Sequence, residues 1–171
     1  MTTRPPVLVF MGVSSTGKST VAAMLAGRLG WPFQEGDDLH PAANVAKMAA
    51  GHALNDQDRA PWLDIVAAWI DERIARGEPG IITCSALKRR YRDVLRRDEV
   101  TFVHFTGDRA LILDRMMRRQ GHFMPPALLD SQFGTLEAPG TDERSIAIDV
   151  AQTPAEQADE IVTRLGLVPW P

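Results

Sequence analysis

The chain has 171 residues, of which 44% are hydrophobic and 24% charged, and its net charge is −3 at pH 7. This length predicts a substantial core, and the composition is ordinary for a globular enzyme. The slight acidity and the absence of a basic tail argue against nucleic acid as the main partner. The one cysteine, Cys84, excludes an intramolecular disulfide framework and is typical of a reducing compartment. Because no apolar run approaches the roughly 18 residues that span a bilayer, we expect a cytoplasmic protein that binds no membrane.

A glycine-rich run at residues 12–19, Gly-Val-Ser-Ser-Thr-Gly-Lys-Ser, fits the phosphate-binding P-loop pattern Gly-x4-Gly-Lys-[Ser/Thr]. An apolar run at residues 7–11 predicts a buried strand before it. Apolar residues at helical spacing predict a helix after it that ends at Gly30. A strand, a glycine loop and a helix in this order are the context that the motif requires. An ordinary Gly/Ser-rich turn with an exposed lysine explains the pattern less well.

The chemistry of this run follows from its backbone. Gly12 and Gly17 permit a tight turn, so that successive N–H groups and the helix N-terminus point at phosphate groups. Lys18 should reach the β- and γ-phosphates as a catalytic residue, and the Ser19 hydroxyl should bind Mg²⁺. The sequence therefore predicts a site for ATP and Mg²⁺. The expected nucleotide contacts are Gly12, Ser14, Ser15, Thr16, Gly17, Lys18, Ser19 and Thr20.

Strands and helices alternate along the rest of the chain. Further strands are expected at residues 31–34, 80–84, 101–105 and 145–149. Helices are expected from Pro41 to near Gly51, from the end of a polar loop at 52–60 to Gly77, around 91–95, from an Asp108 cap through 116, around 128–133, and after a capping box at 153–156. This alternation predicts an α/β fold of three layers, α/β/α, with a five-stranded parallel sheet. Because no linker divides the chain, residues 1–171 should form one domain.

A second substrate should bind at the carboxyl ends of the strands, where open parallel sheets hold their ligands. Segments 12–19, 36–40 and 84–88 should meet there. Asp37 follows the second strand and offers a carboxylate that can orient an acceptor hydroxyl and take its proton, as a kinase requires. The open alternative is that Asp37 or Asp38 caps the helix that follows.

Cationic side chains flank the same region. Arg59 suits bidentate capture of a carboxylate or phosphate, although the neighbouring Asp56 or Asp58 can also cap the next helix. Lys88 and Arg92 are four residues apart and so share one helix face. That face either binds substrate or is a solvated basic surface.

Three arginines, Arg115, Arg118 and Arg119, precede a break in the helical pattern at Gly121. Arginines beside a mobile lid, here about residues 115–137, can close over the transferring phosphoryl group. The alternative is an exposed basic helix end that the helix dipole favours.

Longer motifs connect these positions. They are Gly-Asp-x-Leu-His-Pro at 36–41, Leu-Asn-Asp-x-Asp-Arg-x-Pro-Trp-Leu at 54–63, Cys-Ser-Ala-Leu-Lys at 84–88, Gly-His-Phe at 121–123 and Ser-Gln-Phe at 131–133. Together they resemble gluconokinase, a family of P-loop small-molecule kinases related to shikimate and nucleoside monophosphate kinases. The resemblance extends from about residue 7 to residue 149 and is more specific than the P-loop alone.

The resemblance implies ATP-dependent phosphorylation of D-gluconate at its 6-hydroxyl, which gives 6-phospho-D-gluconate and ADP. It also implies a P-loop kinase fold with a mobile lid, and often a homodimer. Asp37 would be the acceptor-side base, Arg115 and Arg119 would be lid arginines with Arg119 catalytic, and Arg144, with residues 142 and 143, would border the adenine. The implied substrate contacts are Asp37, His40, Arg59, Ser85, Lys88 and Arg92.

One position departs from the common pattern of P-loop enzymes. The third strand ends in Cys84-Ser85 and has no Walker-B aspartate, so Mg²⁺ would rest on Ser19, the phosphates and water, with Asp37 or Ser85 in an outer shell. Another small-molecule kinase of this fold, such as shikimate kinase, stays open as an alternative. A nucleotide-dependent switch of the GTPase type is disfavoured, because the sequence has no guanine-specifying Asn-Lys-x-Asp run.

Overall fold

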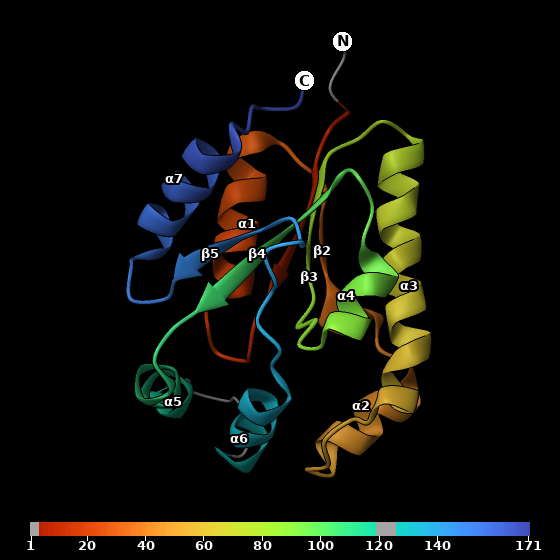
Figure 1. The fold of residues 1–171 in the computed structure, drawn as a ribbon, viewed down its shortest axis with the longest axis vertical. Helices are drawn as coiled ribbons and strands as arrows, with labels where there is room; N and C mark the ends of the chain where they lie inside the picture. The colour runs from red at the N-terminus through yellow and green to blue at the C-terminus, as the bar shows by residue number, and fades with distance from the viewer. Residues whose placement is uncertain (1–3, 119–125) are drawn as a thin grey trace.

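The computed structural model describes residues 4–118 and 126–171. In this part of the chain, five parallel strands form one sheet in the order β2-β3-β1-β4-β5. The strands are β1 (Val7–Met11), β2 (Phe33–Glu35), β3 (Gly80–Thr83), β4 (Val100–Thr106) and β5 (Ser145–Asp149). Helices α1 (Lys18–Leu29) and α7 (Pro154–Leu165) cover one face of the sheet, and α3 (Asp56–Ala75) and α4 (Arg89–Leu95) cover the other (Figure 1). The predicted three-layer α/β/α fold with a five-stranded parallel sheet is confirmed.

The central strand β1 explains why the fold has two cores. All five of its residues are fully buried. Leu8 and Phe10 belong to the core under α1 and α7, and Val7, Val9 and Met11 belong to the core under α3 and α4. Because both faces are covered, the strand is a continuous apolar run rather than an alternating one.

The remaining elements lie beyond the carboxyl ends of the strands. They are the 3-10 helix η1 (Gly36–Leu39) and the helices α2 (Ala42–Ala49), α5 (Arg109–Arg118) and α6 (Pro126–Thr135). Figure 1 shows α2, α5 and α6 at this edge of the sheet. Strands β3 and β4 flank β1 on opposite sides, so the chain reverses its winding direction at the loop after β1, which is where open α/β sheets bind ligands.

Several predicted boundaries shift, and the expected polar loop at 52–60 is wrong in its second half. Helix α3 begins at Asp56 because Asn55 caps it. The Asn55 side chain accepts from the N–H of Asp58 at 2.8 Å, and the Asp58 carboxylate accepts from the N–H of Asn55 at 2.9 Å. Asp58 thus takes part in capping α3 as the N3 member of a capping box, whereas the N-cap residue is Asn55 and Asp56 caps nothing there. The capping box at the start of α7 is confirmed, with Thr153 and Glu156 hydrogen-bonded reciprocally.

Two other local predictions change as well. The second strand occupies Phe33–Glu35 rather than residues 31–34. Asp37 and Asp38 lie within η1, and α2 begins after Pro41 without a side-chain cap, so neither aspartate caps that helix. Within the described residues, we find no helix long and apolar enough to cross a membrane.

Candidate active site

A cleft of about 430 Å³ opens at the carboxyl ends of the strands. It is lined by the P-loop and the start of α1, by the segment after β2, by the start of α3, by the end of β3 and by α6. Three sequence segments predicted to meet, at residues 12–19, 36–40 and 84–88, all contribute to it. Its volume lies in the usual range for small-molecule sites.

The P-loop adopts a conformation that only certain residues permit. Gly12 has a φ of 137°, and a Cβ there would lie 2.6 Å from the carbonyl oxygen of Phe105. Gly17 has a φ of 86° and precedes the first turn of α1. Ser15 also has a positive φ, 64°, and its Oγ is a buried atom with no hydrogen-bond partner among the described residues. The buried hydroxyl of Ser15 thus lacks a hydrogen-bond partner among the described residues. A phosphate oxygen bound in the loop would supply one.

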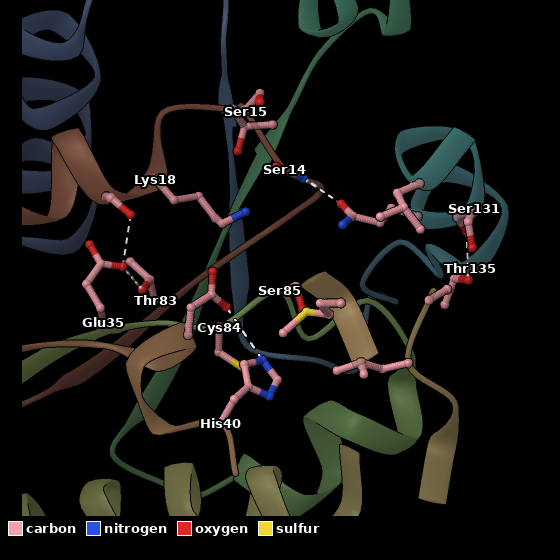
Figure 2. Close-up of a pocket in the computed structure, with 18 of the residues that line it drawn as sticks. Ser14, Ser15, Lys18, Glu35, His40, Thr83, Cys84, Ser85, Ser131 and Thr135 are labelled. Atoms are coloured by element: carbon pink, nitrogen blue, oxygen red, sulfur yellow. Dashed lines mark hydrogen bonds and ion pairs between the residues drawn. The ribbon is translucent and has the colours of Figure 1, made fainter. Parts of the chain in front are cut away.

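The lysine of the motif lies over this loop. Lys18 Nζ donates to the carbonyl oxygens of Gly12 and Val13, both at 2.8 Å. Figure 2 shows the Lys18 side chain pointing into the cleft between Ser15 and Thr83. Its ammonium group therefore lies beside the loop that would hold the phosphates.

Glu35, which the sequence analysis missed, places a carboxylate against the P-loop. Its Oε2 accepts from the hydroxyl of Ser19 at 2.9 Å and from the hydroxyl of Thr83 at 2.7 Å (Figure 2). The end of β3 has no aspartate, and the carboxylate comes from the neighbouring strand β2. The only available signal was the Glu-Gly-Asp sequence at 35–37, which puts two carboxylates on one strand end.

These residues fit a magnesium ion that is shared with phosphates. In the described part of the chain, no group of three or more His, Cys, Asp or Glu side chains could hold a metal ion alone. Mg²⁺, however, is commonly bound by one or two carboxylates with phosphate oxygens and waters. The hydroxyl of Ser19 and the carboxylate of Glu35 provide that partial set.

Asp37 lines the cleft in the segment that follows β2. Its position depends on Gly36, because a Cβ at residue 36 would lie 1.9 Å from the carbonyl oxygen of Thr83. The glycine thus lets η1 turn directly over the end of β3. The Asp37 side chain is 84% exposed, and its carboxylate is 3.8 Å from His40 Nε2.

His40 is held in one orientation by three neighbours. Its ring stacks on Trp62 with centroids 4.1 Å apart, and the Trp62 indole donates to the carbonyl of Gly36 at 2.7 Å. Asn44 Nδ2 donates to Asp58 O and also lies 3.2 Å from His40 Nδ1. Since an amide nitrogen only donates, Nδ1 accepts, and the ring proton of neutral His40 lies on Nε2, the nitrogen that faces Asp37. Burial lowers the pKa of His40, although Asp37 opposes this shift, so the neutral form prevails near pH 7.

Two cations at the start of α4 converge on Asp56, the first residue of α3. Asp56 accepts from Lys88 Nζ at 2.9 Å, from Arg90 Nη1 at 2.6 Å and from the hydroxyl of Tyr91. The hydrogen bonds from Tyr91 and Lys88 lower the pKa of Asp56 to about 2. Arg59 donates to the Tyr91 hydroxyl at 3.1 Å and lines the cleft. Lys88 is the N-cap residue of α4. Unlike Arg59, it is not among the residues that line the cleft.

The helix α6 closes the cleft on the P-loop side. Ser131, Gln132 and Thr135 line it, and the Ser14 N–H donates to Gln132 Oε1 at 2.7 Å. Figure 2 shows Ser131 and Thr135 of α6 on the same side of the cleft as Ser14. Sequence reasoning did not single out Gln132, because nothing local predicts which side of α6 meets the P-loop.

Comparisons with known proteins agree on one family. The shikimate kinase family matches residues 14–165. A gluconokinase from Gluconobacter oxydans (strain 621H) is 51% identical over 161 residues, which are 93% of this chain and 90% of that protein. The thermosensitive gluconokinase of Escherichia coli (strain K12) is 47% identical, with 83% of this chain and 78% of that protein covered. The chain belongs to the gluconokinases of the shikimate kinase family.

Solved structures agree with this assignment. A gluconokinase from Sinorhizobium meliloti 1021 is 45% identical, with a TM-score of 0.84 and coverage of 96% of this chain and 95% of that chain. A sugar kinase from Janibacter sp. HTCC2649 is 46% identical, with a TM-score of 0.91 and coverage of 96% of both chains. APS kinase from Mycobacterium tuberculosis, at 16% identity and a TM-score of 0.69 over 97% of this chain and 100% of that one, shares the fold alone. The expected P-loop kinase fold is thereby confirmed.

Two residues that the gluconokinase resemblance placed in the site lie elsewhere. Arg92 is fully buried and donates to both carboxylate oxygens of Glu143, at 2.7 and 3.2 Å, and to the carbonyls of Ala86 and Leu87. It is neither a solvated basic residue nor part of the cleft wall. The expectation that Arg92 binds substrate is corrected to that of a buried structural cation.

Arg144 is corrected for a geometric reason. It immediately precedes β5, so it lies at the amino ends of the strands, opposite the P-loop. Its guanidinium donates to the carbonyl oxygen of Asp98, and its own carbonyl accepts from the N–H of Phe102. The neighbouring carboxylate of Asp142 is bound to Arg89. Residues 142–144 therefore do not border the nucleotide cleft of this gluconokinase-family chain.

Two of the three arginines that precede the predicted lid break, Arg115 and Arg118, lie within the described residues. Arg115 lines the cleft. Arg118 is exposed and pairs with Asp114 at 3.1 Å on the same helix, consistent with a solvated basic helix end. Arg119 lies outside the described residues.

Proposed function

We propose that the protein is a gluconokinase that transfers the γ-phosphoryl group of ATP to the 6-hydroxyl of D-gluconate and releases 6-phospho-D-gluconate and ADP. The observation that carries this proposal is that the P-loop lysine and an acceptor-side carboxylate and arginine line one cleft. Lys18, Asp37 and Arg59 all face the same space. The gluconokinase named for Gluconobacter oxydans, at 51% identity, supports this choice of acceptor.

The donor half of the reaction uses the P-loop. Its N–H groups and the N-terminus of α1 would bind the phosphate chain, and Lys18 would turn from its loop carbonyls to the β- and γ-phosphates. Ser19 and Glu35 would hold Mg²⁺, which when bound neutralises charge on the phosphate oxygens. Arg115, which lines the cleft from α5, would approach the phosphate chain.

The acceptor half uses Asp37 and Arg59. Arg59 would bind the gluconate carboxylate as a planar fork of N–H donors, with its orientation fixed by Tyr91. Asp37 would accept the proton of the 6-hydroxyl as the hydroxyl oxygen bonds to the γ-phosphorus and the bond to the β–γ bridging oxygen breaks. The Nε2–H of His40 faces Asp37 and orients its carboxylate.

The test is a substrate comparison with purified protein, ATP and Mg²⁺. Gluconate should be phosphorylated far faster than shikimate, glucose or a nucleoside monophosphate, with the product identified as the 6-phosphate by NMR. Absence of activity on gluconate, or equal rates on shikimate, would reject the proposal. A homodimer stays a prediction from the family resemblance, and a cytoplasmic location stays a prediction from the composition. Sedimentation equilibrium and cell fractionation would check them.

A further inference from the structure

The helix α6 places a hydrogen-bond acceptor on the P-loop. The Ser14 N–H donates to Gln132 Oε1 at 2.7 Å. A backbone N–H can only donate, so the group that it meets is the carboxamide oxygen of Gln132. Ser14 belongs to the loop whose N–H groups bind phosphate oxygens in such motifs. The Gln132 oxygen therefore occupies a place where a phosphate oxygen would accept.

The backbone of α6 is fixed close to this contact. Directly after the helix, the Glu137 N–H donates to Leu87 O at 2.7 Å, and the Glu137 carboxylate accepts from the Arg89 N–H at 2.8 Å. These two bonds attach the C-terminal end of α6 to the start of α4. Gln132 lies just over one turn before this attachment, and Leu136 N–H donates to its carbonyl at 2.9 Å. Rotation of the Gln132 side chain can vacate the loop without breaking these backbone contacts.

We propose that Gln132 is a surrogate for phosphate: its carboxamide oxygen accepts from the Ser14 N–H in the empty enzyme, and a triphosphate oxygen displaces it on binding. The loop thereby keeps one of its N–H groups hydrogen-bonded before the nucleotide arrives. The contact also opposes nucleotide binding, because it must be broken. This inference rests on the proposed function in one respect only, namely that the ligand is a nucleoside triphosphate.

A purely structural role for Gln132 predicts a different pattern. If the contact only supported α6, its removal would lower stability and weaken every ligand together. If the Gln132 oxygen instead competes with phosphate for the Ser14 N–H, its removal has the opposite effect. Ligands with a phosphate chain then bind more tightly, and the affinity for phosphate-free ligands is unchanged. The direction of the change in affinity thus separates the two roles.

The experiment compares Gln132→Ala and Gln132→Glu with the wild type, by calorimetry with a non-hydrolysable ATP analogue, inorganic tripolyphosphate and adenosine. Loss of one neutral hydrogen bond should tighten the ATP analogue and tripolyphosphate about two- to tenfold in Gln132→Ala. Adenosine should bind as to the wild type. Gln132→Glu should weaken both phosphate ligands at pH 7.5, because a carboxylate on Ser14 repels them. Gln152→Ala is the control, since Gln152 donates to Glu160 at 3.0 Å and is not among the residues that line the cleft, and it should change nothing.

Unchanged or weaker binding of both phosphate ligands to Gln132→Ala would overturn the proposal. Thermal unfolding of each variant shows whether it is folded, and Gln132→Met, which keeps the length of the side chain without its carbonyl, replaces the alanine variant if that one unfolds. The proposed function fails separately, if the wild-type enzyme binds no ATP analogue or does not phosphorylate gluconate. Tripolyphosphate would still report on Gln132 in that case.

Discussion

The hydroxyl of Ser19 donates to the carboxylate of Glu35 across 2.9 Å, so the P-loop and the end of β2 share a hydrogen bond. This pair occupies the place that an aspartate at the end of β3 would otherwise fill. Thr83, which ends β3, donates to the same carboxylate oxygen. This side of the cleft is therefore built by two adjacent strands and the loop.

We expect Glu35→Gln to lower activity about 10- to 100-fold and to raise the Mg²⁺ concentration needed for half-maximal rate, because the charge beside Ser19 is lost. Initial rates at a series of Mg²⁺ concentrations measure this. Glu99→Gln is a suitable control, since Glu99 pairs with Arg4 at the other end of the sheet. An unchanged Mg²⁺ dependence would remove Glu35 from the metal site.

Replacement of Asp37 by Asn should lower kcat about 10²- to 10⁴-fold, because the amide cannot take the proton of the acceptor hydroxyl. The dissociation constant of an ATP analogue should change little, since Asp37 lies on the acceptor side. The matched control is Asp38→Asn, because Asp38 is exposed and is not part of the cleft wall. Near-normal turnover of Asp37→Asn would argue that another group is the base.

The buried pair of Arg92 and Glu143 predicts a large loss of stability when one partner is removed. Arg92→Ala leaves a buried carboxylate unpaired and should lower the free energy of unfolding by about 3–5 kcal/mol, measured by urea denaturation. Arg92→Met with Glu143→Leu should recover much of that loss, because no buried charge remains. Arg96→Ala, which breaks an exposed pair with Asp93, should cost at most about 1 kcal/mol. Equal losses for the Arg92 and Arg96 variants would contradict this reading.

His104 predicts a pH dependence of stability. Burial, with Arg92 and Lys18 nearby, lowers its pKa from 6.5 to about 4. In the unfolded chain this imidazole is protonated below about pH 6.5, whereas in the folded chain it stays neutral down to about pH 4. The free energy of unfolding therefore falls as the pH decreases from 6.5 to 4. The full contribution is about 3 kcal/mol. Urea denaturation at pH 7.5, 5.5 and 4.5 should show a smaller decrease for His104→Phe, and parallel profiles would exclude His104 as the cause.

The strands and the P-loop could be predicted from sequence because their signals are local. A strand that is buried on both faces, such as β1, must be apolar throughout, and the turn at Gly12 and Gly17 requires glycine at fixed positions. The placement of Asp37 beside the loop followed from the rule that parallel sheets bind ligands at their carboxyl ends. Arg59 was singled out by its side-chain chemistry and by the family resemblance. These features are properties of single segments.

The errors involve partners that are distant in sequence. Glu143 is 51 positions from Arg92, and nothing near Arg92 indicates that its charge is buried. The role of Glu35 depends on β2 lying next to β3, and that of Gln132 on how α6 packs. Arg144 is an exception, since a residue that precedes a parallel strand must lie at the edge opposite the site.

The left-handed backbone of Ser15 has a consequence for affinity. A residue other than glycine in this region costs roughly 1–3 kcal/mol, and here the cost is met when the chain folds, because Ser15 already has this backbone conformation and Gly12 lies close against Phe105. A ligand then needs little further ordering of the loop, so less of its interaction energy is consumed by lost conformational entropy. Preorganisation of one serine thus shifts part of the free-energy cost of nucleotide recognition from the binding step to the folding of the protein.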